Sequence, residues 1–395
     1  MPARARERAG GRPLACVLGN TDLIRALGLA GIHSATPGRR DSPKAYSRFV
    51  DVRLDYADNW GPPEPLLELL LSFAESQPEP PVLFFQHDGD LMFVSRNREA
   101  LATRFRFAIA DRYLVEHAVD KTRFADLARE RGLPVPATAV LRPGDHPNEP
   151  PELPIPYPVV LKPLTRRDVV WRPLAGNAKA LRIDHPRRLA ELWPALSSAR
   201  VDLVAQALVE GAEDRIESYH VYVDARGETA GEFTGRKVRT WPAVYGETTA
   251  CEITDEADVR ELGRHCTGVL GLRGVAKLDF KRGPDGTLHL LEVNPRFNLW
   301  HLPGAVAGVN LPALVHADLA GLPRPAVGPL RPGVRWSLPW RDLAAARHAG
   351  IPLHHWLIWQ ARCETRHVAA LDDPMPFLRG LAWRHARGRL RRRSP

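Results

Sequence analysis

The chain has few cysteines and no long hydrophobic run. Its four cysteines show neither CxxC nor metal-ligand spacing, which indicates reduced thiols; they are Cys16, Cys251, Cys266 and Cys363. The apolar stretch from Leu14 to Leu18 is too short for a signal peptide. No run of about 20 apolar residues is present to span a membrane. We therefore expect a cytoplasmic protein without a membrane span.

The body of the chain also lacks an excess of positive charge, although the net charge is +9. Residues 1–12 carry +3 and residues 379–395 carry +7, so the two tails hold +10 and the rest of the chain −1. The arginine-rich end is either a solvated terminus or a segment that touches anionic surfaces. Because no basic groove with interleaved aromatic residues is present in the body, we do not expect nucleic-acid binding.

At 395 residues, 44% of them hydrophobic, the chain is long enough for two or three domains with cores of their own. The apolar run Leu14 to Asn20 is followed by a helical pattern, which predicts an α/β opening. The second glycine of a dinucleotide-binding Rossmann motif is missing here, which argues against a dinucleotide cofactor. A second apolar strand, Pro81 to Asp88, ends in polar residues, so His87 and Asp88 are either substrate contacts or part of a turn.

Three oxygen-bearing side chains lie on two apolar runs that a Gly-Pro-Asp-Gly turn joins. Val275 to Phe280 and Leu288 to Val293 have the content of buried strands, and the turn predicts an antiparallel hairpin. Glu292 and Asn294 leave the second strand on one face, and the hairpin brings Asp279 opposite them. Because a buried, unpaired carboxylate is costly, we prefer a Mg²⁺ site to a solvated surface hairpin.

The spacing of Asp279 and Glu-x-Asn-Pro-Arg, with His301 to Pro312 after it, resembles the metal-binding signature of the ATP-grasp superfamily. The layout is most similar to its carboxylate-amine ligase branch, including the D-aspartate ligase-like group. This resemblance implies an α/β and α+β protein with a Rossmann-like preATP-grasp domain, a two-lobed ATP-grasp fold and a helical C-terminal extension. The expected segments are residues 13–115, 116–210, 211–325 and 326–395.

The resemblance also implies which residues bind the nucleotide. Asp120 to Thr138 reads as an amphipathic helix ended by Gly132, and Arg142 to Pro158 as a surface loop. The set expected to contact ATP comprises Lys121, Lys162, Lys179, Gln206, Val209, Glu210 and Lys237. Thr165 to Arg182 replaces the Gly/Ser-rich loop that covers the phosphates in many relatives. Lys179 then either directs a charge to the phosphates or is exposed at the start of a strand.

Other cations and polar groups are candidates for substrate binding. Residues 218–239 predict a hairpin that turns at Arg226 and Gly227, with a half-buried first strand. Its second strand ends in Arg236, Lys237 and Arg239, which bind either phosphates and an acidic substrate or solvent. The remaining candidates near the first domain are Asn20, Ser47, Arg48, His87 and Asp88.

The activity that the resemblance implies is ATP-dependent formation of an amide through an acyl phosphate, with release of ADP and phosphate. Two Mg²⁺ ions, or Mn²⁺, held by Asp279, Glu292 and Asn294 neutralise the phosphates, while Lys162 and Arg296 add charge. The partners are a small carboxylate and an amine, and a homodimer is one assembly that the sequence allows. A carboxylase, a small-molecule kinase and a non-catalytic nucleotide-binding regulator are the alternatives.

Overall fold

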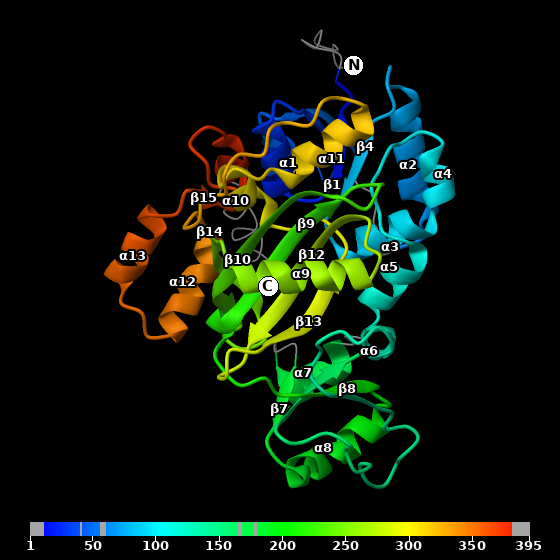
Figure 1. The fold of residues 1–395 in the computed structure, drawn as a ribbon, viewed down its shortest axis with the longest axis vertical. Coiled ribbons are helices and arrows are strands. Elements are labelled where there is room, and N and C mark those ends of the chain that lie inside the picture. Colours follow the sequence, from blue (N-terminus) through cyan, green and yellow to red (C-terminus); the bar gives the residue numbers. More distant parts are fainter. Residues whose placement is uncertain (1–11, 40–41, 56–60, 165–167, 177–179, 381–395) are drawn as a thin grey trace, which may run out of the picture.

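The structure is a computed structural model that describes residues 12–39, 42–55, 61–164, 168–176 and 180–380. Three sheets and their helices follow one another along the chain (Figure 1). In the described residues, no helix has the length and apolar character needed to cross a membrane.

The N-terminal sheet is parallel, with strand order β3-β2-β1-β4. Its strands are β1 (Ala15–Leu18), β2 (Ser34–Pro37), β3 (Val50–Leu54) and β4 (Val82–Phe85). The helices are α1 (Thr21–Gly28), α2 (Glu64–Glu75), α3 (Asp88–Arg96), α4 (Arg98–Ala102) and the 3-10 helix η1 (Pro43–Tyr46). Helix α1 begins directly after β1 because the Asn20 side chain accepts a hydrogen bond from Asp22 N at 3.0 Å. The strand order reverses between β1 and β4, where α/β sheets bind ligands.

The second sheet is a small antiparallel lobe of order β5-β8-β6-β7. It contains β5 (Thr138–Leu141), β6 (Val159–Pro163), β7 (Leu181–Ile183), β8 (Leu203–Ala207) and the helices α7 (Asp168–Ala175) and α8 (Pro186–Ser198). This lobe forms the lower end of the view in Figure 1. Its buried residues, among them Trp171 and Trp193, form a hydrophobic cluster drawn from this lobe alone.

The third sheet has seven strands in the order β13-β12-β9-β10-β11-β14-β15. They are β9 (Ile216–Val223), β10 (Thr229–Trp241), β11 (Glu247–Thr254), β12 (Gly274–Arg282), β13 (Leu288–Asn294), β14 (Arg335–Ser337) and β15 (Thr365–Arg366). The associated helices are α9 (Ala257–Val269), α10 (His301–Val306), α11 (Leu311–Ala320) and the 3-10 helix η2 (Glu213–Arg215). The β9–β10 hairpin that turns at Arg226 and Gly227 is confirmed. The expectation that β9 is half-buried is wrong, because all eight of its residues are buried between layers.

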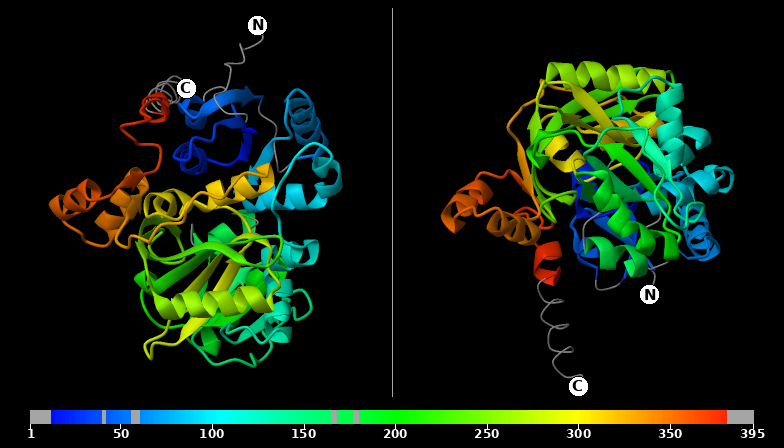
Figure 2. Two further views of the ribbon diagram at one scale, coloured as in Figure 1. Left: turned by 45° about the horizontal axis from the view of Figure 1, so that its top comes forward. Right: turned by 90° about the horizontal axis from the view of Figure 1, so that it is seen from below.

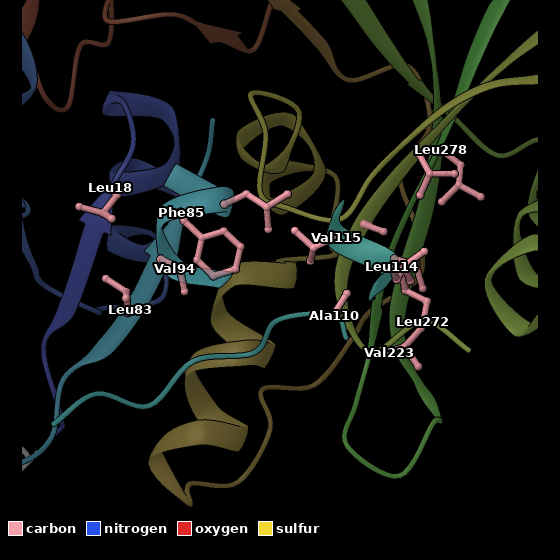
Figure 3. Close-up of a cluster of buried hydrophobic side chains, with 14 of the residues drawn as sticks. Leu18, Leu83, Phe85, Val94, Ala110, Leu114, Val115, Val223, Leu272 and Leu278 are labelled. Atoms are coloured by element: carbon pink, nitrogen blue, oxygen red, sulfur yellow. The ribbon is translucent and has the colours of Figure 1, made fainter. Parts of the chain in front are cut away.

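A continuous hydrophobic core joins the parallel sheet to the seven-stranded sheet. Helices α5 (Arg112–Val119) and α6 (Lys121–Glu130) connect the first sheet to the small lobe. Figure 3 shows Leu114 and Val115 of α5 between Leu18 and Phe85 on one side and Leu278 on the other. Large apolar side chains therefore pack the first sheet against the third.

Other expectations about local structure have mixed outcomes. Helix α6 ends before Gly132, whose φ is +62°, and residues 142–158 form a loop between β5 and β6, as predicted. Helix α7 lies within the segment Thr165 to Arg182, which replaces the Gly/Ser-rich loop of many relatives. The domain boundaries at residues 115, 210 and 325 stay a prediction.

The C-terminal region is helical, but it also adds two strands to the large sheet. Helices α12 (Pro339–His348) and α13 (Leu353–Ala361) lie to one side of the body in both views of Figure 2. Asp342 of α12 is fully buried and accepts two hydrogen bonds from Arg239 of β10, at 2.7 and 2.8 Å. It also accepts hydrogen bonds from Thr249, Trp356 and Gln360. Every acceptor site of this carboxylate is therefore satisfied inside the protein.

The segment after β15 returns to the N-terminal sheet. His367 Nδ1 lies 2.6 Å from Asp22 Oδ2, and Asp22 is fully buried. Burial by itself lowers the pKa of His367, but the Asp22 carboxylate outweighs burial and the opposing Arg25 charge, so the pKa is raised above 6.5. The charged pair therefore holds the C-terminal segment against α1.

We expect Asp342→Ala to lower the free energy of unfolding by about 3–5 kcal/mol, because it leaves the Arg239 guanidinium buried without its carboxylate. Denaturant unfolding measures the loss. Glu99→Ala is the matched control, since Glu99 also accepts two hydrogen bonds from one arginine, Arg112, but both side chains are exposed. The control should cost less than about 1 kcal/mol. Equal losses in the two variants would contradict a stabilising role for the buried pair of Asp342 and Arg239.

We expect His367→Ala to destabilise the protein in a pH-dependent way. A pKa raised in the folded state gives stability that is complete below the unfolded pKa, near 6.5, and is lost as pH rises through the folded pKa. The loss should be about 1.5–3 kcal/mol at low pH and smaller above the folded pKa. Unfolding curves between pH 5.5 and 9.5 test this. His33→Ala, which removes an exposed pair with Asp51, should show little effect at either end.

Candidate nucleotide and metal site

The hairpin of β12 and β13 brings the predicted metal ligands together. The strands are antiparallel, with Asp279 paired to Glu292 and Lys277 paired to Asn294. The turn closes through a hydrogen bond from Gly283 N to Thr287 O at 2.8 Å. A bulge after Asp279 shifts the register of the remaining residues, but it leaves the Asp279–Glu292 pair in place. The two carboxylates are therefore cross-strand neighbours.

Asp279 is buried and surrounded by cations. Its Oδ2 lies 2.7 Å from Lys277 Nζ and 3.6 Å from Lys237 Nζ, and its Oδ1 accepts a hydrogen bond from the Ser218 hydroxyl. Burial would raise the pKa of Asp279, but the Lys237 and Lys277 ammonium groups outweigh it and hold the pKa well below its usual range. Asp279 is therefore an anion at neutral pH.

Glu292 and Asn294 complete an oxygen-rich group beside Asp279. Glu292 is exposed, and its Oε1 accepts a hydrogen bond from Asn294 Nδ2 at 3.1 Å. The described residues contain no group of three His, Cys, Asp or Glu side chains arranged to hold a metal, so the predicted set depends on the Asn294 amide oxygen. Two carboxylates and one amide are hard oxygen ligands, which suit Mg²⁺ or Mn²⁺. The side chains fit the metal that the sequence analysis predicts.

The charge of Lys162, on the small lobe, interacts with that of Glu292. Lys162 of β6 is half-buried and donates a hydrogen bond to Gln206 Oε1 of β8 at 2.9 Å. Burial lowers the pKa of Lys162, Glu292 opposes this shift, and Lys237 and Lys281 add to it. These charge effects cross from the small lobe to the large sheet. Lys121, at the start of α6, donates to Pro163 O at the end of β6.

The segment that follows β8 contains Val209 and Glu210, two of the residues predicted to contact ATP. Leu208 N donates to Pro158 O at 2.9 Å, and the chain then passes through Val209 and Glu210 to Gly211, whose φ is +114°. The Glu210 carboxylate is exposed and lies 3.9 Å from Arg182 of β7. Gln206 is thus next to Lys162, while Glu210 lies at the lobe's edge. Lys179 is outside the described residues.

Arg296 connects the metal hairpin to the parallel sheet. Its Nε donates to Asp88 Oδ1 at 2.6 Å, one Nη to Gln86 O at 2.9 Å, and the other Nη to Asn294 Oδ1 at 3.1 Å. Asp88 begins α3, after β4, so Arg296 reaches the carboxyl edge of the first sheet. Of the residues predicted for substrate binding, the structure brings Asp88 to the site.

The other predicted substrate contacts have partners elsewhere. Ser47 Oγ donates to Asp373 Oδ2 at 2.5 Å, and Arg48 N donates to Asp373 Oδ1 at 2.9 Å. Arg239 is bound to Asp342, as described above. Asn20 caps α1 and lies near the carboxyl edge of β1. Ser47, Arg48 and Arg239 thus attach the C-terminal region, and the structure does not bring them to the metal hairpin.

Sequence reasoning missed two lysines of β12. Lys277 and Lys281 alternate with Asp279, and both are buried. Lys277 is hydrogen-bonded to Asp279. Burial lowers the pKa of Lys281, and the carboxylates that oppose this shift are Glu213, Glu210 and Asp214. The signal was in the sequence, because residues two apart on a strand share a face.

Comparison with known proteins supports the fold. The chain is 22% identical to a D-aspartate ligase of Enterococcus faecium (strain Aus0004) over 288 residues, which cover 70% of this chain and 68% of the relative. The solved N5-carboxyaminoimidazole ribonucleotide synthetase, an ADP complex, has a TM-score of 0.62 and 14% identity, covering 86% of this chain and 85% of the other.

An L-amino acid ligase from Bacillus licheniformis has a TM-score of 0.61 and 15% identity, covering 83% of this chain and 79% of the other. No family model matches the chain. The chain therefore shares the fold of these solved enzymes, the fold class that the sequence analysis expected, and its similarity to a D-aspartate ligase agrees with the resemblance stated there.

Proposed function

We propose that the chain is an ATP-dependent ligase that joins a carboxylate to an amine through an acyl phosphate. One observation carries this proposal. Asp279, Glu292 and Asn294 lie together on the hairpin, with lysine side chains and Arg296 beside them. Phosphoryl transfer depends on positioning and charge neutralisation more than on covalent help from the protein. A regulator that only binds a nucleotide has no use for this combination.

The relatives support the same reaction class. The Enterococcus faecium relative and the Bacillus licheniformis structure are named as amino acid ligases. We propose that this chain also uses an amino acid as its amine substrate. The domain division given above belongs to the same proposal, with ATP between the small lobe and the large sheet.

In the proposed reaction, a substrate carboxylate oxygen forms a bond to the γ-phosphorus of ATP as the bond to ADP breaks. The amine nitrogen then attacks the acyl carbon, the bond to the phosphate oxygen breaks, and the nitrogen loses a proton. When bound, Mg²⁺ or Mn²⁺ supplies charge neutralisation of the phosphates. Asp279, Glu292 and Asn294 would hold it.

Protein side chains have separate roles in this scheme. Lys162 and Lys237 contribute positive charge on the two sides of the phosphates, and Lys277 adds charge beside Asp279. Arg296 lies between Asn294 and the parallel sheet, so it is placed to bind the oxygen atoms of the acyl phosphate. Gln206 and the chain through Val209 and Glu210 face the base and ribose.

Product analysis tests the reaction class. Purified protein is incubated with Mg-ATP and a pool of amino acids and small carboxylates, and ADP and AMP are separated by chromatography. We expect ADP and phosphate only when a carboxylate and an amine are both present. ADP with a single substrate would favour a kinase, and AMP with pyrophosphate would contradict the acyl phosphate.

We expect Glu292→Gln to reduce turnover by at least about a hundredfold, because loss of one group that stabilises transition-state charge commonly costs about that much. The exposed position and the similar volume of Gln predict an unchanged melting temperature. Calorimetry and steady-state ADP release measure the two quantities. Glu228→Gln is a control carboxylate in the β9–β10 turn, at the opposite end of β9 from Ser218, which donates a hydrogen bond to Asp279. Normal ADP release by folded Glu292→Gln would remove the metal site from the mechanism.

We expect Lys162→Met to weaken ATP binding by about 10- to 100-fold, the cost of one charge-assisted hydrogen bond. Binding of the carboxylate substrate should change much less, because Lys162 lies on the small lobe. Isothermal titration with a non-hydrolysable ATP analogue and with the carboxylate gives both constants. Equal losses for the two ligands would argue against a phosphate role.

A further inference from the structure

The distribution of lysine in this chain is uneven. The sequence contains 7 lysines and 48 arginines, so exposed positive charge is supplied almost entirely by arginine. Five of the six described lysines lie around the nucleotide and metal site; they are Lys121, Lys162, Lys237, Lys277 and Lys281. Lysine differs from arginine in being a compact point charge with three rotatable donors. The sixth described lysine, Lys44, lies in the 3-10 helix η1, beside the N-terminal sheet.

Lys44 extends across the carboxyl ends of two parallel strands. Its aliphatic stem passes over Gly38, directly after β2, where an added Cβ would lie 3.1 Å from Lys44 Cε. Its Nζ donates to Gly19 O, directly after β1, at 2.8 Å. The ammonium group is thus held over the edge of the sheet at which α/β proteins bind ligands.

The electrostatic surroundings of Lys44 leave it short of negative charge. Its described hydrogen bond is to a carbonyl oxygen. Burial lowers the pKa of Lys44 to about 8, and the Asp90 carboxylate opposes this shift only in part. A cation that has lost water and gained only a carbonyl is better stabilised by an incoming anion.

The peptide group between Gly19 and Asn20 contacts Lys44 through its carbonyl oxygen and Gln86 through its N–H. The Gln86 side chain also has a hydrogen-bond donor without a partner in the part of the chain that the structure describes. Its Oε1 accepts from Asn20 N at 2.8 Å, which leaves Nε2 buried and without a partner among the described residues. The Gln86 carbonyl oxygen in turn accepts from Arg296. A continuous set of contacts therefore runs from Lys44 through Gly19, Asn20 and Gln86 to Arg296.

We propose that Lys44 binds the carboxylate of the amine substrate, so that the amine is an α-amino acid bound at the carboxyl edge of β1 and β4. This inference rests on the proposed ligase function. Asp88, exposed at the same edge and held by Arg296, supplies a negative charge for the ammonium group. The charges of Lys44 and Asp88 match those of a zwitterion, whose ammonium group releases one proton to solvent before the neutral nitrogen attacks the acyl carbon. Hydrogen bonds from Arg296 to Asp88 and Asn294 connect this edge of the sheet to the metal hairpin.

Chemical labelling tests the site without relying on ligase activity. The full-length protein is acetylated at pH 8 with a lysine reagent, and the modification of each lysine is followed by mass spectrometry. An amino acid at ten times its dissociation constant should slow the labelling of Lys44 about tenfold. Ethylamine, which is alanine without its carboxylate, should not. Lys121 in the same samples is the internal reference, which amino acids should leave unchanged.

Kinetics of Lys44→Met test the same point in turnover. The variant keeps the length of the stem, and its KM for the amino acid should rise about 10- to 100-fold while its KM for ATP stays the same. It should also lose the preference for alanine over ethylamine. Arg53→Met, which removes an exposed cation from β3 of the same sheet, is the matched control and should leave both constants unchanged.

The outcomes separate the two proposals. Amide formation by the wild type together with unprotected Lys44, or with an unchanged amino acid KM in folded Lys44→Met, overturns the subsite and leaves the ligase standing. Absence of amide formation overturns the ligase, and protection by amino acids then still decides the subsite. If Lys44→Met fails to fold, the labelling of the wild type decides.

Discussion

The pairing of β12 with β13 is the constraint on which the candidate site depends. A one-residue change in this register would move Glu292 and Asn294 to the opposite face from Asp279. The turn at Gly283 and the bulge after Asp279 fix that register, and β9 fixes the other edge of β12. Because β9 is buried on both faces, the hairpin rests on the most enclosed strand of the sheet. The position of three polar side chains is therefore maintained by apolar packing elsewhere.

Lysine and arginine side chains surround Asp279 and Glu292 from several parts of the chain. Lys277 touches Asp279, Lys237 lies further away, and Lys162 acts from the other lobe. Arg296 is different, since it is held in place by three acceptors on two parts of the chain. In the proposed reaction, the lysines would direct their charge to the phosphates, and Arg296 would connect the nucleotide to the parallel sheet.

Local signals in the sequence predicted the elements that carry the site. The turn residues and the two-residue spacing of Glu292 and Asn294 were enough for the hairpin, and Gly132 marked the end of α6. The same spacing on β12 also contained Lys277 and Lys281, but a lysine in an apolar strand gives no hint of its partner. Ser47, Arg48 and Arg239 could not be assigned from sequence, because Asp373 and Asp342 are distant in the chain. Contacts of that range depend on how the C-terminal region returns to the body.

The small lobe has a hydrophobic cluster of its own, whereas the parallel sheet and the large sheet share theirs. Opening the small lobe away from the large sheet therefore separates polar and charged contacts and leaves each apolar core closed. Residues at the two ends of the lobe, near Gly132 and Gly211, have backbone conformations that glycine adopts without strain. In the proposed reaction, the small lobe would move about Gly132 and Gly211 to admit the nucleotide and release the products without unfolding of either core.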